Sequence, residues 1–234
     1  MTPLARFLDP ANVSLKICGI IREDDATDLV ALGVDALGVN FWPGSKRYLA
    51  PEEAGWLAGF AGRIARVGVF VNAPSALPLR LYRDGLIDLI QLHGDETPED
   101  AAAFRDAGVP FIKAFGVRTA DDSERAGDYG AAAVLLDAHA PGVYGGTGKV
   151  FDWAVAVDFK RNHPDLPLIL AGGIVPKNAA DAAKFVRPAA LDIASGAEHS
   201  PGVKDMEKVR RLIGCLKPDT APTSPMPPPM NNDH

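Results

Sequence analysis

The chain has 234 residues, of which 47% are hydrophobic and 23% charged, values that suit one large or two small globular domains. The formal net charge of −6 speaks against nucleic acid as a partner, because nucleic-acid binding needs a basic patch. The N-terminus shows no signal-peptide pattern, no apolar stretch approaches the ~20 residues of a transmembrane helix, and only two cysteines occur. We therefore expect a cytoplasmic protein with free thiols and no membrane partner.

Short runs rich in Val, Ile and Leu recur along the chain, as expected for strands that are buried on both faces. In chain order they cover residues 14–20, 36–41, 65–72, 89–94, 110–117, 133–138, 166–174 and 191–198. Stretches with helical start and stop signals lie between them, namely 22–33 with acids in its first turn, 97–108 with Thr97 and Pro98 at its start, and 175–185 with Pro176. Strands that alternate with helices predict a parallel sheet with helical crossovers.

Eight such units predict a (β/α)8 TIM barrel of the α/β class, which forms one domain of this size. A doubly wound open sheet is the alternative, although no G-x-G-x-x-G follows the first strand. We expect the barrel over 14–215 and an N-terminal extension over 1–13. Residues 216–234 are rich in Pro and lack apolar periodicity, which predicts a disordered tail.

Polar residues and glycines gather at the C-terminal ends of the predicted strands, where barrels carry their active sites. A barrel that only packs has no need of this pattern, so we expect a binding site at this end. The residues concerned include Lys16, Cys18, Asn40, Asn72, Gln91, His93, Asp137 and Asp192. Of these, we expect Gln91, His93 and Asp192 to contact the substrate.

Glycines follow both the seventh and the eighth predicted strand, at Gly172, Gly173 and Gly196, with Ser195 beside the last. In barrels these two loops often hold a phosphate through backbone amides, and glycine lets the backbone approach the anion closely. Ordinary turn glycines are the alternative. The pattern in both loops favours a phosphate site and hence a phosphorylated small-molecule partner.

Cys18 and Asp137 are the candidates for chemistry. A lone cysteine is more often a packing residue than a catalyst, but Cys18 ends a strand. Lys16, two residues earlier, faces the same side, and its cation would favour the reactive thiolate. Asp137 follows three apolar residues, so it either terminates its strand or acts in the site. The five histidines do not cluster with cysteines or acids at ligand spacing, so we expect no metal site.

Seven motifs appear in order from about residue 14 to residue 215 and together resemble the phosphoribosylanthranilate isomerase family. They are "KICGI", "GVNFWPGSKRY", "VGVFVN", "QLHGDE", "LLDA" with the later "GGTGKVFDW", "LAGGI" followed by "PKNA", and "LDIASGAEHSPGVKD". The resemblance implies a cofactor-free Amadori rearrangement of N-(5-phosphoribosyl)anthranilate in L-tryptophan biosynthesis. It also implies that Cys18 is the general base, that Asp137 is the general acid and that Arg47 holds the anthranilate carboxylate.

Three alternatives stay open beside this resemblance. The histidine-pathway isomerase performs the same type of reaction, but we would expect an aspartate in place of Cys18. Indole-glycerol-phosphate synthase would carry a lysine acid and a glutamate pair, which we do not find. A catalytically silent barrel that only binds a phosphorylated ligand would suggest loss of Cys18 or Asp137, and both are present. The sequence is compatible with a monomer or a homodimer and assigns no role to the tail.

Overall fold

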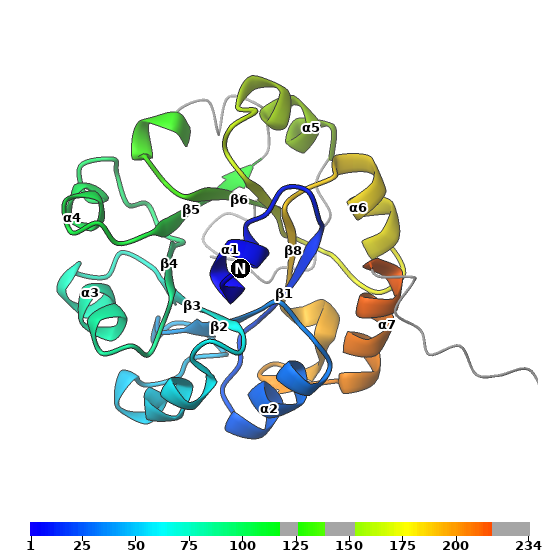
Figure 1. Cartoon of the computed structure of the whole chain (residues 1–234), viewed down its shortest axis with the longest axis horizontal. Helices are drawn as coiled ribbons and strands as arrows, with labels where there is room; N and C mark the ends of the chain where they lie inside the picture. The colour runs from blue at the N-terminus through cyan, green and yellow to red at the C-terminus, as the bar shows by residue number, and fades with distance from the viewer. Residues whose placement is uncertain (118–125, 139–152, 217–234) are drawn as a thin grey trace, which may run out of the picture.

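The computed structural model describes residues 1–117, 126–138 and 153–216. Eight parallel strands close into a barrel in chain order, which confirms the predicted (β/α)8 fold and excludes the open sheet (Figure 1). The strands are β1 (Ser14–Cys18), β2 (Ala36–Asn40), β3 (Ala65–Phe70), β4 (Leu89–Leu92), β5 (Phe111–Val117), β6 (Ala133–Ala138), β7 (Leu168–Leu170) and β8 (Ala190–Ile193). The predicted tail, apart from Leu216, lies outside the described residues.

Helices surround the barrel. They are α2 (Glu23–Ala31), α3 (Ala76–Arg83), α4 (Ala102–Asp106), α5 (Trp153–Asn162), α6 (Ala179–Val186) and α7 (Met206–Leu216), and the 3-10 helix η1 (Pro51–Phe60) takes the place after β2. No helix in the described part of the chain has the length and apolar character needed to cross a membrane.

Several elements are shorter than the sequence predicts, whereas β6 has the predicted bounds. β1 stops at Cys18 rather than residue 20, because Gly19 adopts a left-handed conformation with φ of +80° that does not continue a strand. The helix expected over 97–108 becomes regular only at Ala102. The predicted cap is nevertheless present, since the hydroxyl of Thr97 accepts a hydrogen bond from the backbone N–H of Asp100 at 3.2 Å.

Side chains that point into the barrel change in character along each strand. Along β4 and the residue after it, the inward positions are Leu89, Gln91 and His93. On β6 they are Ala133, Leu135 and Asp137. Apolar residues therefore fill the N-terminal half of the interior, and polar residues occupy the C-terminal half. A second apolar cluster lies between the strands and the outer helices.

The N-terminal extension is packed against the barrel. Residues Pro3–Phe7 form helix α1, which begins with the Thr2 hydroxyl accepting a hydrogen bond from the N–H of Ala5 at 3.2 Å. Phe7 is fully buried in the inner apolar cluster, and Leu4 and Leu8 pack beside it. Figure 1 looks onto this end and shows α1 in the centre of the ring of strands. Part of the expected extension thus closes the N-terminal end of the barrel.

Candidate active site

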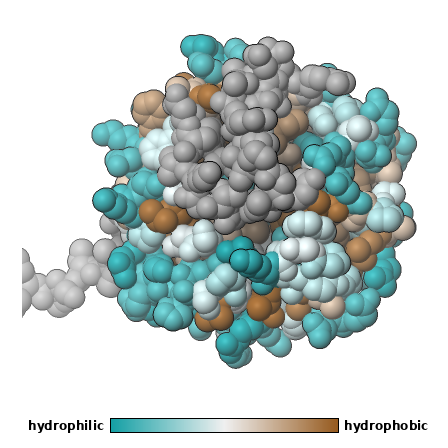
Figure 2. Space-filling model, turned by 180° about the vertical axis from the view of Figure 1, so that it is seen from behind, coloured by the Kyte–Doolittle hydropathy of each residue, from teal (hydrophilic) through white to brown (hydrophobic). Residues whose placement is uncertain are grey.

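One pocket opens at the C-terminal ends of the strands. Figure 2 views the molecule from this end. Lys16 and Asn72, which the sequence also placed at this end, are not among the lining residues. The lining does include the other predicted residues, namely Cys18, Asn40, Arg47, Gln91, His93, Asp137, Gly172, Gly173, Asp192, Ser195 and Gly196. Residues from six strands or their following loops are therefore brought together as expected, while their individual roles stay predictions.

The thiol of Cys18 lies beside a buried ion pair at the end of β1. The register of β1 and β8 places Lys16 opposite Asp192, and the Lys16 ammonium donates to Asp192 Oδ1 at 2.9 Å without any exposure to solvent. On the other side, Cys18 pairs with Gly38 of β2. A Cβ atom at Gly38 would lie 2.8 Å from the Cys18 sulfur and 3.0 Å from Lys16 Nζ. Gly38 therefore leaves the space in which the thiol and the ammonium meet.

Lys16 favours the thiolate of Cys18, as expected, but burial of the thiol acts more strongly in the opposite direction. Burial raises the pKa of the Cys18 thiol above its ordinary value, because the charged form loses its hydration, and the nearby Asp192 carboxylate adds to this effect. The ammonium groups of Lys16 and Lys204 act in the opposite direction but do not outweigh burial. Burial likewise disfavours the Lys16 cation, yet Asp192 and Cys18 together hold the pKa of Lys16 above its ordinary value. Burial thus favours the neutral thiol of Cys18, whereas Asp192 favours the cationic form of Lys16.

Asp137 at the end of β6 faces the imidazole of His93 across the barrel. The distance from His93 Nε2 to Asp137 Oδ2 is 3.5 Å. The other ring nitrogen, Nδ1, is 2.8 Å from the amide nitrogen of Gln91, which can only donate. With the amide nitrogen as donor to Nδ1, the imidazole would carry its proton on Nε2, toward the carboxylate of Asp137. Gln91 is fully buried, and its amide oxygen has no hydrogen-bond partner among the described residues.

Arg47 lies on the loop after β2, and its stem crosses Gly19, where a Cβ atom would come within 2.2 Å of Arg47 Cδ. The guanidinium forms a two-pronged pair with Glu198, with Nε 2.7 Å from Oε1 and Nη2 2.6 Å from Oε2. From the sequence, a substrate carboxylate is the expected partner of Arg47, and neither Glu198 nor the nearby Lys204 stands out. The signal was present, since both belong to the quoted motif "EHSPGVKD".

The two glycine-containing loops meet in the lining of the pocket. Gly172 and Gly173 adopt left-handed conformations, with φ of +85° and +66°, that favour glycine. The side chain of Asn178 closes this loop, because its Nδ2 donates to the carbonyl of Gly173 at 3.0 Å. A Cβ atom at Gly196 would lie 1.9 Å from the carbonyl oxygen of Ile174, so only glycine fits there. The backbone conformation and the close packing therefore favour glycine at these positions, in addition to the predicted binding of phosphate.

The chain matches the family model of N-(5'-phosphoribosyl)anthranilate (PRA) isomerase over residues 15–214. An N-(5'-phosphoribosyl)anthranilate isomerase of Geobacter sulfurreducens is 44% identical over 208 residues, which cover 88% of this chain and 98% of that protein. The isomerase of Trichlorobacter lovleyi is 40% identical over 207 residues, again with 88% and 98% coverage.

Solved structures give the same result. The phosphoribosyl anthranilate isomerase of Thermotoga maritima superimposes with a TM-score of 0.80 at 36% identity and covers 88% of this chain and 99% of that chain. The structure from Thermus thermophilus gives 0.77 at 41% identity, with coverage of 87% and 98%. A further isomerase structure, with a TM-score of 0.77, 35% identity and coverage of 88% and 99%, contains reduced 1-(o-carboxyphenylamino)-1-deoxyribulose 5-phosphate.

Proposed function

This chain belongs to the N-(5'-phosphoribosyl)anthranilate isomerase family, and from that premise we propose that its pocket performs an Amadori rearrangement with Asp137 as the acid and Cys18 as the base. The family acts in tryptophan biosynthesis. The proposed substrate is N-(5-phosphoribosyl)anthranilate, and the product is 1-(2-carboxyphenylamino)-1-deoxyribulose 5-phosphate. The observation that carries the proposal is the position of Cys18 on β1 and Asp137 on β6, both lining one pocket.

In the first step the carboxylic acid of Asp137 protonates the ring oxygen of the ribose. The bond between C1′ and that oxygen breaks, and the nitrogen lone pair forms the C1′=N iminium. Asp137 becomes a carboxylate, which the Nε2–H of His93 faces at 3.5 Å. The imidazole therefore stabilises the charge that this step leaves on the acid.

In the second step the thiolate of Cys18 removes the proton from C2′, and the C1′=N electron pair returns to nitrogen. The enolamine then takes a proton at C1′ from the Cys18 thiol and gives its 2′-hydroxyl proton to the Asp137 carboxylate. Both groups thus regain their starting protonation, and the net change is an isomerisation. The pKa of the Cys18 thiol is raised by burial in the empty site. The iminium brings a positive charge next to the thiol and thereby favours the thiolate at the step that needs it.

Both ends of the substrate are anions, and the pocket offers a different grip for each. The guanidinium of Arg47 suits the planar carboxylate of the anthranilate, and the amides of the Gly173 and Gly196 loops suit the phosphate. The buried amide oxygen of Gln91 needs a donor, which a sugar hydroxyl in the pocket would supply. Such grips at both ends would fix the reacting carbons between acid and base.

The decisive experiment mixes the purified protein with freshly generated phosphoribosylanthranilate and follows the loss of anthranilate-type fluorescence. We expect catalysed loss of the signal and formation of the aminoketose, identified by mass spectrometry. A protein that binds the product analogue but leaves the substrate unchanged would instead be a silent barrel. Turnover of the histidine-pathway aminoaldose in its place would assign the pocket to the other Amadori reaction.

A further inference from the structure

A two-stranded hairpin outside the barrel buries its charged side chains and exposes its valine. After β8, the short turn η3 (Ser195–Ala197) leads into β9 (Glu198–Ser200), which pairs antiparallel with β10 (Val203–Lys204). The side chains of Glu198 and Lys204 are 3% and 0% exposed, whereas Val203 is 39% exposed. A hairpin that only covered the barrel would bury the valine, because a buried ion pair contributes little net stability. The inverted pattern indicates that these charges have another use.

Glu198 is the partner of Arg47. Its Oε2 accepts from Arg47 Nη2 at 2.6 Å, and its Oε1 accepts from Arg47 Nε at 2.7 Å and from the N–H of Gly202 at 3.1 Å. This grip fixes the plane of the guanidinium at the wall of the pocket. It leaves Nη1 of Arg47 without a partner among the described residues. A carboxylate that enters the pocket therefore meets a guanidinium that is already oriented.

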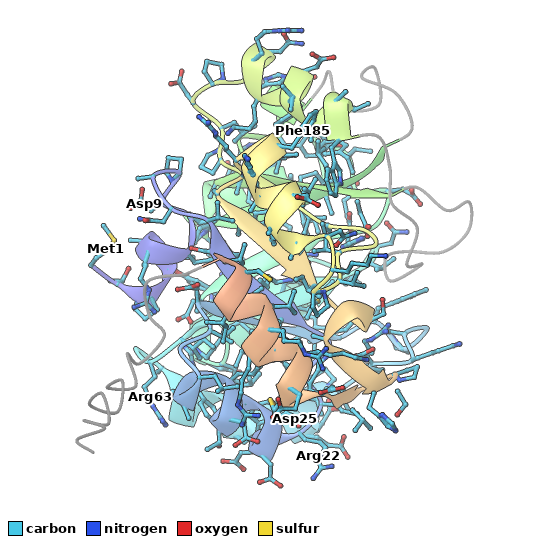
Figure 3. All side chains as sticks on the ribbon, turned by 90° about the vertical axis from the view of Figure 1, so that its right-hand side faces the viewer. Met1, Asp9, Arg22, Asp25, Arg63 and Phe185 are labelled. Carbon is cyan, nitrogen blue, oxygen red and sulfur yellow. The ribbon has the colours of Figure 1, made fainter. Side chains whose placement is uncertain are left out.

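Lys204 connects the same carboxylate to the end of β1. Its ammonium donates to Glu198 Oε1 at 2.7 Å and to the carbonyl oxygen of Cys18 at 2.5 Å. The hairpin thus holds the backbone of the residue that carries the thiol. Figure 3 shows α1, with Met1 and Asp9 labelled, at one end of the barrel and this hairpin at the other.

Basic groups outnumber acidic groups in this cluster. Two basic groups, Arg47 and Lys204, meet one acidic group, Glu198, in a protein with a formal net charge of −6. Burial lowers the pKa of the Lys204 ammonium, and Glu198 opposes this effect. Burial would favour a neutral Glu198, but Arg47 and Lys204 hold the pKa of its carboxyl below the ordinary value. A local positive charge beside the pocket suits an anionic ligand group and also a thiolate.

We propose that Glu198 and Lys204 are positioning residues of the active site, with Glu198 orienting Arg47 toward the anthranilate carboxylate and Lys204 holding Cys18. This inference rests on the proposed function for the identity of the ligand. Neither residue touches the reacting atoms, and each acts through a residue that lines the pocket.

The first test measures how fast iodoacetamide alkylates Cys18 in the empty enzyme as a function of pH, with Cys215 as the internal reference in the mass spectrum. The charged groups around the thiol are Lys16 on β1, Asp192 on β8, Lys204 on β10 and the guanidinium of Arg47. The Lys204→Met variant lacks one basic group near the thiol. We therefore expect the midpoint of the pH profile of Cys18 alkylation to move to higher pH by about one unit.

Lys208→Met is the matched control for this test. Lys208 also donates to the hairpin, to the carbonyl of Glu198 at 2.7 Å, but it is 37% exposed and has no contact with Cys18. Its profile should equal that of the wild type. If Lys204→Met does not fold, Lys204→Gln replaces it and keeps a donor without the charge. An unchanged midpoint in the folded variant would overturn the role of Lys204.

The second test measures the affinity of Glu198→Gln for reduced 1-(o-carboxyphenylamino)-1-deoxyribulose 5-phosphate and for inorganic phosphate. We expect about tenfold weaker binding of the analogue, because a neutral amide cannot hold the guanidinium as firmly, and unchanged binding of phosphate. In an Arg47→Met background the same substitution should have no effect on either ligand.

Two results would overturn the role of Glu198: equal losses for analogue and phosphate, or a loss that persists in the Arg47→Met background. Both would indicate a general structural effect. The alkylation profile needs neither substrate nor turnover. An inactive wild type would therefore contradict the proposed function without touching the result for Lys204.

Discussion

At its N-terminal end the barrel is closed by α1, with the ring of Phe7 buried among apolar residues, whereas at its C-terminal end the same strands surround an open pocket with Cys18, His93 and Asp137. On β6 the change from Leu135 to Asp137 takes two residues, one step of the strand repeat. The same eight strands therefore form both ends of the barrel. The closed end contributes apolar packing, and the open end contributes the polar side chains of the pocket. Substitutions should separate these contributions, with stability affected at one end and chemistry at the other.

The largest effect should follow from loss of the acid or the base. Asp137→Asn cannot donate a proton and Cys18→Ala cannot accept one, so we expect kcat to fall by about 10²–10⁴-fold in each case. Binding of the product analogue and the unfolding temperature should stay close to the wild type. Steady-state kinetics and thermal unfolding measure both quantities. Cys215→Ala, on α7 and outside the pocket, is the control for the loss of a thiol. A pure effect on KM would mean that the residue only binds substrate.

The opposite pattern is expected at the closed end. Phe7→Ala removes a fully buried ring from the inner cluster and should lower the free energy of unfolding by about 3 kcal/mol. Denaturant unfolding gives this number. The kcat and KM of the folded variant should equal those of the wild type, because α1 lies at the end away from the pocket. A fall in kcat would show that the two ends are coupled through the strands.

The sequence was sufficient for the strand order of the barrel and for the end that carries the pocket, because both follow from repeated patterns. It did not reveal α1, although Thr2, Pro3 and the spacing of Leu4, Phe7 and Leu8 were a helix signal. The pairing of Arg47 with Glu198, 151 positions apart, depends on how the hairpin folds back and has no local signal. The raised pKa of Cys18 also required the structure, because burial and neighbouring charges oppose each other there.

A smaller effect is expected where the pocket grips the ligand rather than reacts with it. Arg47→Lys loses the planar, two-pronged geometry but keeps the charge, so we expect the product analogue to bind more weakly by about 1–3 kcal/mol. Calorimetric titration measures this loss. Inorganic phosphate serves as the control ligand and should bind as before. A selective loss of phosphate affinity would mean that the two ends of the substrate are assigned the wrong way round.

The burial of Cys18 predicts a pH dependence at the open end. Because the pKa of the thiol is raised and only the thiolate reacts, alkylation of the empty wild type should be slow at pH 7 and accelerate with pH, toward a midpoint above the ~8.5 of a free cysteine. Lys16, Lys204 and Arg47 favour the thiolate, and Asp192 opposes it. Quenching the alkylation reaction at set times and measuring the products by mass spectrometry gives the rate at each pH. A midpoint below that of a free cysteine would show that the cations outweigh burial.

The smallest effect should come from the ion pair of Arg6 with Asp35, which lies beside α1. The Arg6 Nε is 3.4 Å from Asp35 Oδ1, and the side chain of Arg6 is 52% exposed. An ion pair with one exposed partner is screened by water, so Arg6→Ala should change the free energy of unfolding by less than about 1 kcal/mol. The comparison with Phe7→Ala in the same denaturant series then separates charge from burial as the cause of closure at this end. Equal losses in the two variants would mean that α1 is held by its charge, whereas a large difference would assign the closure to the buried ring.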